Sequence, residues 1–175
     1  MPLSLEDFVD DKPWQDDIPL LDDAYISSQI DGVRLQRLRT RADGRGDLTV
    51  LLSSLYEPVA PPPHVYHVSA GPGSIRAWVY HKRQSDRLAF LDGELRVVLY
   101  DLRPDSRTYG KLDVLDVGEA NKILLTIPPM VIHGVHNRGA ATATFVNMPT
   151  HPYDPARPDK ARLRFDHPGI PYSFA

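Results

Sequence analysis

Short runs of Val, Ile, Leu, Tyr and Phe recur between residues 49 and 148, and Gly, Pro, Asp or Asn bounds each run. Apolar runs of this length are typical of β-strands, whereas no segment after residue 12 keeps a helical period over three turns. Many short, regularly spaced strands favour a β-sandwich, jelly roll or barrel, so we expect an all-β fold. The predicted strands are Thr49–Leu55, His64–Val68, Ser74–His81, Arg87–Leu91, Glu94–Asp101, Leu112–Val117, Lys122–Ile127, Ile132–Asn137 and Ala141–Met148.

Local patterns add detail to this expectation. Asp92-Gly93 lies between two apolar alternations and predicts a two-residue hairpin turn. Ser4 and the residues after it predict one short helix, with Ser4 as its N-cap. In the strand that ends at residue 81, alternation predicts one face with Ala77, Val79 and His81 and an opposite face with Arg76, Trp78 and Tyr80.

The length of 175 residues fits one domain, residues 1–175. Within it we expect an acidic N-terminal arm at residues 1–30, a jelly roll at residues 31–148 and a C-terminal segment at residues 149–175. The C-terminal segment is rich in proline, which favours an extended path over the surface. Its prolines are Pro149, Pro152, Pro155, Pro158, Pro168 and Pro171.

Composition narrows the classes of partner. The chain has 20 basic and 23 acidic residues, a net charge of −3, and the two signs are mixed along the sequence. Nucleic acids and anionic membranes both need a concentrated basic face, so we expect neither as a partner. No apolar run reaches the length of a membrane span, the acidic N-terminus is unlike a signal peptide, and cysteine is absent. These features favour a cytoplasmic protein without disulfides or thiolate metal sites.

Histidines are the main candidates for chemistry in a chain without cysteine. His81 ends its predicted strand and is therefore expected near a barrel mouth, where small ligands bind. Pro128, His133 and Asn137 have a spacing that resembles the second conserved motif of the cupin superfamily, with Met130 where glycine is usual. This resemblance implies a cupin-type jelly-roll barrel with His133 pointing into it.

A metal site is not expected. A metal-binding cupin has a second histidine two residues before the position of His81 and a glutamate shortly after it, but Val79 occupies the first position and no glutamate follows. Two imidazoles alone make a poor site for a first-row metal, so we predict no metal and no cofactor. A metal-dependent cupin activity is kept as a minor alternative.

Several collinear motifs between residues 32 and 165 resemble the dTDP-4-dehydrorhamnose 3,5-epimerase family. The most specific is Asp101-Leu-Arg-Pro-Asp-Ser-Arg-Thr-Tyr-Gly110, in which Arg107 stands where proline is usual. The others are weaker singly: Asp43-Gly-Arg45-Gly46, Gly73-Ser-Ile-Arg76, Ile127-Pro128 through His133-Gly134, and Tyr153-Asp154-Pro155. The resemblance implies a metal-free cupin that epimerises a sugar nucleotide. In that reaction a base takes a proton next to a ketone, a cation stabilises the enolate, and a tyrosine returns a proton to the other face.

The chain departs from the family at its catalytic positions. Val79 stands where the family has its histidine base, Asp86 where it has a lysine, and Asn147 where it has the tyrosine. The aspartate that orients the base has no counterpart, unless Asp166 serves. Valine cannot be a base, so the family's own catalytic set cannot operate here.

The binding positions are better retained. Arg45 and Arg76 match the residues that hold the diphosphate, a role that suits the guanidinium fork. His64 and Tyr66 match a polar pair of the sugar or base pocket, and Asn147 and Tyr153 are added to the substrate-binding set. Arg103 and Ser106 are expected to stabilise their own loop.

His81-Lys82 also resembles the second histidine and lysine of sugar-nucleotide 3,4-ketoisomerases. We therefore predict His81 as the catalytic base or acid and His133 as its companion. The leading hypothesis is an epimerase or isomerase relative that acts on a dTDP-4-keto-6-deoxyhexose-like substrate, as in the nucleotide-sugar metabolism that supplies polysaccharide biosynthesis. The alternative is a catalytically silent protein that binds a sugar nucleotide or keto-sugar. The resemblance also implies a homodimer.

Overall fold

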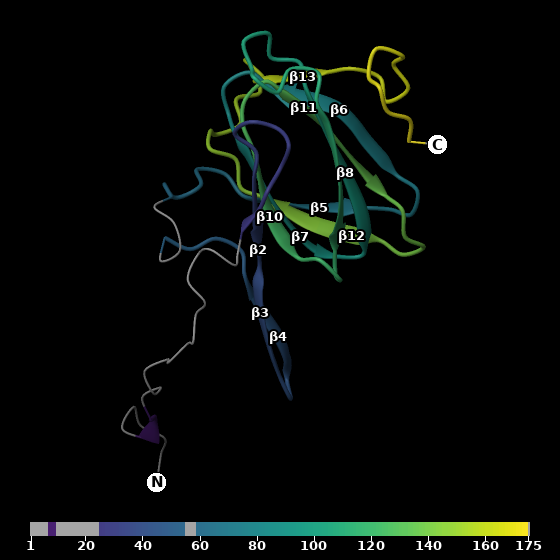
Figure 1. Cartoon of the computed structure of the whole chain (residues 1–175). Helices are drawn as coiled ribbons and strands as arrows, with labels where there is room; N and C mark the ends of the chain where they lie inside the picture. Colours follow the sequence, from purple (N-terminus) through teal and green to yellow (C-terminus); the bar gives the residue numbers. More distant parts are fainter. Residues whose placement is uncertain (1–6, 10–24, 55–58, 175) are drawn as a thin grey trace.

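The computed structural model describes residues 7–9, 25–54 and 59–174, and its core is a jelly roll of two antiparallel sheets that face each other (Figure 1). The described residues contain no α-helix, and so no helix that could span a membrane. The strands are β1 (Tyr25–Ile26), β2 (Arg34–Arg37), β3 (Arg39–Asp43), β4 (Gly46–Val50), β5 (Tyr66–Ala70), β6 (Ile75–His81), β7 (Asp86–Asp92), β8 (Glu94–Asp101), β9 (Leu112–Gly118), β10 (Ile123–Ile127), β11 (Val131–Asn137), β12 (Ala143–Asn147) and β13 (Lys160–Arg162).

One sheet has the strand order β1-β2-β10-β7-β12-β5 and the other has the order β13-β6-β11-β8-β9. The main core fills the space between them, because alternate residues of both sheets turn their apolar side chains inward. Phe90 and Leu125 from the first sheet and Val97, Leu99 and Val131 from the second are fully buried there. The all-β jelly-roll prediction is confirmed.

The Asp92-Gly93 pattern marks a corner between the sheets rather than the predicted hairpin. β7 belongs to the six-stranded sheet and β8 to the five-stranded sheet, and the two strands do not pair. Gly93 has φ 77°, and a Cβ there would overlap Ala143. The hairpin prediction is therefore wrong. A glycine in the left-handed region permits a sharp change of direction, but it does not determine which strand the chain then joins.

A β-bulge in β6 corrects the predicted faces of that strand. His133 pairs with Val79 and Val135 pairs with Arg76. A step of two residues along β11 therefore corresponds to a step of three along β6, which is one extra residue in β6. Because directly paired residues share a face, Arg76 lies on the same inner face as Val79 and His81. The extra residue shifts the alternation, so the prediction that Arg76 shares a face with Trp78 and Tyr80 is wrong. The prediction that Ala77 shares a face with Val79 and His81 is also wrong, because Ala77 packs with Trp78 on the outer face.

The C-terminal segment crosses the surface, as predicted, and adds a strand and a cover. β13 pairs with β6, and farther on Ile170 and Phe174 bury themselves against Trp78 on the outer face of the five-stranded sheet. The Trp78 ring lies 4.8 Å from that of Phe174, between ring centroids. At the other end of the chain, the predicted helix from Ser4 and most of the N-terminal arm lie outside the described residues.

The β3–β4 hairpin stands apart from both sheets. Its two strands pair only with each other, and it projects away from the barrel (Figure 1). Both strands carry mostly polar, exposed residues. The hairpin therefore adds nothing to the core between the sheets.

Candidate functional site

Five strand ends meet at one end of the barrel and bring polar side chains together. His81 is the last residue of β6 and Asp86 the first of β7, and the short connection between them joins the two sheets. Asn147 ends β12 directly opposite Tyr66, which begins β5. Lys160 begins β13 opposite His81. Polar groups at strand ends interrupt no apolar layer of the core.

Asp86 lies at the centre of this group, between two histidines. Its Oδ2 is 3.2 Å from His81 Nε2 and 3.4 Å from His133 Nε2. All three side chains are buried, and the two imidazole rings lie 6.1 Å apart between centroids. We call His81, Asp86 and His133 the histidine–aspartate cluster.

The hydrogen bonds of the cluster fix its electrostatics. Burial alone would raise the pKa of Asp86, but hydrogen bonds from His133 and His81 outweigh burial and hold the pKa well below the usual range. His133 Nδ1 lies 3.2 Å from the carbonyl oxygen of Val131, which can only accept, so this contact is a hydrogen bond in the form of the ring that carries a proton on Nδ1. His81 contacts Asp86 through Nε2, whereas its buried Nδ1 has no hydrogen-bond partner among the described residues.

The other oxygen of Asp86 connects the cluster to β12 and β5. Gln84 Nε2 donates to Oδ1 at 2.8 Å and Asn147 Nδ2 donates to it at 3.2 Å. Asn147 Nδ2 also lies 2.8 Å from the hydroxyl oxygen of Tyr66, whose own proton stays available for another acceptor. Burial raises the pKa of Tyr66 and the charge of Asp86 raises it further, so the phenol is protonated at neutral pH.

A cavity of about 250 Å³ opens above His81. One wall comes from His64 and Tyr66, whose rings lie 5.3 Å apart, and another from the C-terminal segment. We call it the mouth cavity, and its lining residues are His64, Tyr66, His81, Arg83, Gln84, Pro149, His151, Pro152, Tyr153, Asp154, Arg157, Asp159 and Lys160.

Asp159 holds the C-terminal wall in place. Its Oδ2 accepts hydrogen bonds from the backbone N–H groups of Arg83 and Gln84, and its Oδ1 lies 3.2 Å from Arg83 Nε. The next residue, Lys160, is half-buried. Burial lowers the pKa of Lys160 and the charge of Arg162 lowers it further, whereas the charge of Asp86 raises it.

The two predicted diphosphate arginines lie in different places. Arg76 donates to the backbone oxygen of Ser69 at 3.0 Å, and its charge is close enough to lower the pKa of Tyr66. Arg45 lies at the tip of the projecting hairpin, where its side chain is 90% exposed and paired with Asp43. Neither arginine lines the mouth cavity, and the β3–β4 hairpin that carries Arg45 projects away from the barrel (Figure 1).

The specific motif of the sequence forms a loop staple rather than part of the cavity. Asp101 is buried at the end of β8, and its two carboxylate oxygens accept hydrogen bonds from Arg103, Ser106 and Thr108. Arg103 Nη2 also donates to the backbone oxygen of Asp31 at 2.7 Å, which ties the loop to the N-terminal region. The predicted structural role of Arg103 and Ser106 is thus confirmed.

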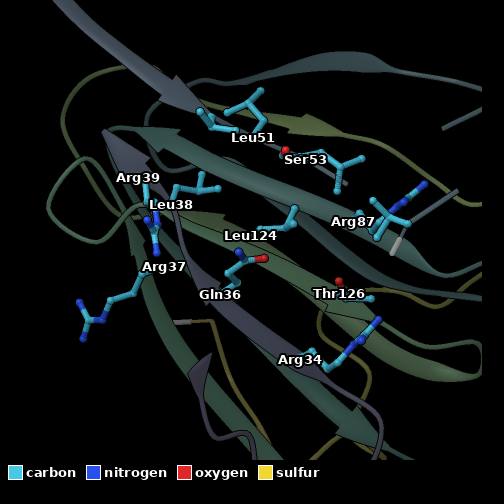
Figure 2. Close-up of a pocket in the computed structure, with 13 residues that line it drawn as sticks. Arg34, Gln36, Arg37, Leu38, Arg39, Leu51, Ser53, Arg87, Leu124 and Thr126 are labelled. Atoms are coloured by element: carbon cyan, nitrogen blue, oxygen red, sulfur yellow. The ribbon is translucent and has the colours of Figure 1, made fainter. Parts of the chain in front are cut away.

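A second hollow lies on the outer face of the six-stranded sheet. Figure 2 shows arginines of β2 and its neighbourhood around an apolar floor that includes Leu38 and Leu124. The enclosed space is about 30 Å³, roughly that of one water molecule. A sugar nucleotide does not fit there, whereas the mouth cavity is lined by His81 of the histidine–aspartate cluster, and we therefore take the mouth cavity as the candidate site.

The sequence model of the dTDP-4-dehydrorhamnose 3,5-epimerase family matches residues 27–173. The chain belongs to this family. It is 37% identical over 151 residues to the spore coat polysaccharide biosynthesis protein SpsL of Bacillus subtilis, a match that covers 83% of this chain and 96% of that protein.

Two further relatives agree with this membership. The probable low-salt glycan biosynthesis epimerase Agl13 of Haloferax volcanii is 34% identical over 139 residues, which cover 78% of this chain and 89% of that one. The crystal structure of a dTDP sugar isomerase from Desulfovibrio desulfuricans G20 superposes with a TM-score of 0.79 at 29% identity, over 85% of this chain and 94% of that one. The fold is therefore that of the cupin-type epimerases.

This member of the family differs from the pattern in an informative way. The sequence prediction treated Asp86 only as the loss of a lysine, whereas the structure makes it the shared partner of His81 and His133. It also overlooked Lys160, which lies in a segment expected only to cover the surface. The available signal was the short spacing from His81 to Asp86, which forces two strand ends to lie together.

Proposed function

We propose that the protein is a sugar-nucleotide epimerase or isomerase that moves a proton next to a ketone on a dTDP-4-keto-6-deoxyhexose-like substrate. The family supports the substrate class, and relatives named for glycan and spore coat polysaccharide biosynthesis support the pathway class. The observation that carries the reaction is the histidine–aspartate cluster under the mouth cavity, since it supplies a base although Val79 replaces the usual one.

In the proposed mechanism His81 removes the proton. Asp86 Oδ2 accepts a hydrogen bond from the Nε2–H group of His81, which leaves the lone pair on Nδ1, and its charge stabilises the imidazolium that forms. The C–H bond next to the ketone breaks, its electron pair forms the enolate double bond, and the carbonyl electrons move to oxygen. His133 supports the cluster from below by its contact with Asp86.

In the same proposal Tyr66, predicted as a substrate-binding residue, returns a proton to the other face. It belongs to the six-stranded sheet and His81 to the five-stranded sheet, and both line the mouth cavity. In this proposal a sugar ring bound in the mouth cavity is contacted by His81 on one face and by the Tyr66 hydroxyl on the other. His64 and Tyr153 complete the proposed binding wall, while Asn147 orients Tyr66 and Arg76, outside the cavity, is kept as a diphosphate contact.

The test is proton NMR of dTDP-4-keto-6-deoxyglucose with the protein in deuterated buffer. We expect loss of a ring-proton signal at C3 or C5 above the rate without enzyme, and its abolition by His81→Ala. Nucleotide affinity should stay within a few fold. His67→Ala is the matched control, because His67 lies on β5 but is exposed and outside the cavity.

Other results of this test would overturn the proposal. Full exchange in His81→Ala would remove the base assignment. Line broadening of the ligand without any exchange would establish the silent binding protein instead. With Tyr66→Phe, deuterium should still enter the ring while the epimeric product is lost, because only the second face has lost its proton donor.

A second candidate, a metal-dependent cupin, is favoured by one observation. Ligand atoms of His81, Asp86 and His133 all lie within 4.8 Å of one another, and two histidines with one carboxylate form a set that binds non-haem iron. A metal held by these three residues would act as a Lewis acid toward a bound carbonyl. Elemental analysis of the purified protein decides: a stoichiometric metal that Asp86→Asn removes would replace the proton-transfer mechanism.

We also propose, on the family resemblance, that the protein works as a homodimer in the cytoplasm. Light scattering on the purified full chain tests the first part, where a mass of one chain would contradict it. Fractionation of the producing cells tests the second.

A further inference from the structure

An enolate needs a cation close to its oxygen, and the family position for that cation holds Asp86 here. Two arginines and one lysine line the mouth cavity: Arg83, Arg157 and Lys160. Arg83 Nε is paired with Asp159 at 3.2 Å and Arg157 Nε with Asp154 at 3.1 Å, and both arginines are mostly exposed. Their charges are already matched at the rim.

Lys160 differs from both arginines in partner and depth. It is half-buried, and within the part of the chain that the structure describes it makes no hydrogen bond or ion pair through its ammonium group. Burial disfavours an ammonium group, and no carboxylate of the described residues lies within ion-pair distance of it; Asp86 acts on it only from farther away. An anionic ligand group in the cavity would supply a partner at that distance.

The register of β13 places Lys160 beside the proposed base. Lys160 is paired directly with His81 in an antiparallel ladder, so the two side chains lie on one face with Cβ atoms about 5 Å apart. In an enolising ketone, the carbon that loses its proton is bonded to the carbon that carries the oxygen. Base and cation must therefore be neighbours, as these two residues are.

The backbone of Lys160 is also held firmly. The preceding residue, Asp159, anchors the segment to the connection between β6 and β7 through two backbone N–H groups and the Arg83 side chain. Lys82 N donates to the Asp159 carbonyl at 3.0 Å. A cation on a fixed strand end needs little rearrangement to meet the developing charge.

We propose that Lys160 is a catalytic residue whose ammonium group donates a hydrogen bond to the enolate oxygen formed when His81 removes the adjacent proton. The assignment rests on the proposed function. Lys160 keeps its own proton throughout: it stabilises the charge on oxygen, and the proton taken from carbon stays on His81 until it is exchanged or replaced.

The test compares Lys160→Met and Lys160→Arg with the native protein, using dTDP-4-keto-6-deoxyglucose as substrate and dTDP alone as the binding probe. Loss of one such donor typically costs about 10²–10³ in rate, so we expect Lys160→Met to lower kcat and ring-proton exchange by that factor. Its Kd for dTDP should change by less than about threefold. Lys160→Arg should recover part of the exchange, because it restores the charge.

Lys82→Met is the matched control, because Lys82 is exposed and lies outside the cavity. Its kinetics should equal those of the native protein, and thermal melts should show all variants folded. Native exchange rates in Lys160→Met would overturn the assignment. So would a loss of dTDP affinity that matches the loss of exchange, since Lys160 would then be an anchor for the diphosphate. Absence of exchange in the native protein would instead refute the proposed function, and this role of Lys160 with it.

Discussion

Replacement of Asp101 by asparagine should destabilise the protein strongly without touching the mouth cavity. Asp101 is fully buried, and its Oδ1 accepts from Arg103 N and Nε at 3.0 and 2.8 Å. Its Oδ2 accepts from Arg103 Nη2, Ser106 Oγ and Thr108 Oγ1 at 2.8, 2.7 and 2.7 Å. Asparagine keeps the shape but removes the charge and turns one acceptor into a donor.

The magnitude follows from the bonds that asparagine cannot make. The hydroxyls of Ser106 and Thr108 can rotate to accept from the new amide, but Arg103 has only donors and loses its charged partner. Hydrogen bonds to charged groups contribute about 1.5–3 kcal/mol each, so we expect a loss of about 3 kcal/mol. For a chain of this size that lowers Tm by about 6–12 °C.

The assay is urea or thermal denaturation of Asp101→Asn against the native protein, with Asp105→Asn as control, since Asp105 is exposed in the same loop. Burial raises the pKa of Asp101, but hydrogen bonds from Arg103, Thr108 and Ser106 outweigh it and hold that pKa well below the usual range. A carboxyl whose pKa is lower in the folded than in the unfolded protein stabilises the folded state at pH values above its unfolded pKa, about 3.9 for Asp. This stabilisation is lost as the pH falls through the folded-state pKa.

The stability difference should therefore be constant from about pH 7 to pH 5 and should narrow below about pH 4. A difference under about 1 kcal/mol at neutral pH would refute the reasoning, because a neutral buried network would then hold the loop equally well. A difference that stays unchanged in acid would refute the charge argument alone.

Three further predictions concern a close backbone contact, the packing around Trp78 and the anchor of the C-terminal wall. Gly118→Ala should cost about 1–3 kcal/mol in urea denaturation, because φ is 131° and a Cβ there would overlap the carbonyl oxygen of Gly93; unchanged stability would contradict this. Phe174→Ala should cost about 3 kcal/mol and shift Trp78 fluorescence to the red, because it uncovers the buried indole; unchanged emission would show that another group covers it. Asp159→Asn should make the C-terminal wall more sensitive to trypsin, since its backbone anchors weaken; a native cleavage rate would count against that anchor.

Much of the barrel was predictable because buried strands appear in the sequence as short runs or alternations of apolar residues. β5 to β12 each carry apolar residues between turn residues, and the predicted ranges agree with them closely. The predicted strand Thr49–Leu55 overlaps only the end of β4. β2, β3 and β13 are rich in arginine, lysine and other polar residues, so they lack the alternation that identifies a half-buried strand.

The candidate site was predictable only in part. His81 and His133 could be placed at a barrel mouth because one ends a strand and the other lies in a motif. The short spacing from His81 to Asp86 brings two strand ends together, but it does not reveal that these strands belong to different sheets or that Asp86 also contacts His133. The inward turn of Arg76 depends on a bulge, and no residue type in β6 signals one.

Residues 149–159 form a wall of the mouth cavity but belong to neither sheet. Changes in the length or composition of residues 151–158, between the anchors at Thr150 and Asp159, therefore expose no part of the main core. The segment is a replaceable loop that is held by Asp159 at one end and by the end of β12 at the other. Chimeras that graft the corresponding loop of a relative onto this barrel should alter ligand choice while His81, Asp86 and the fold remain those of the parent.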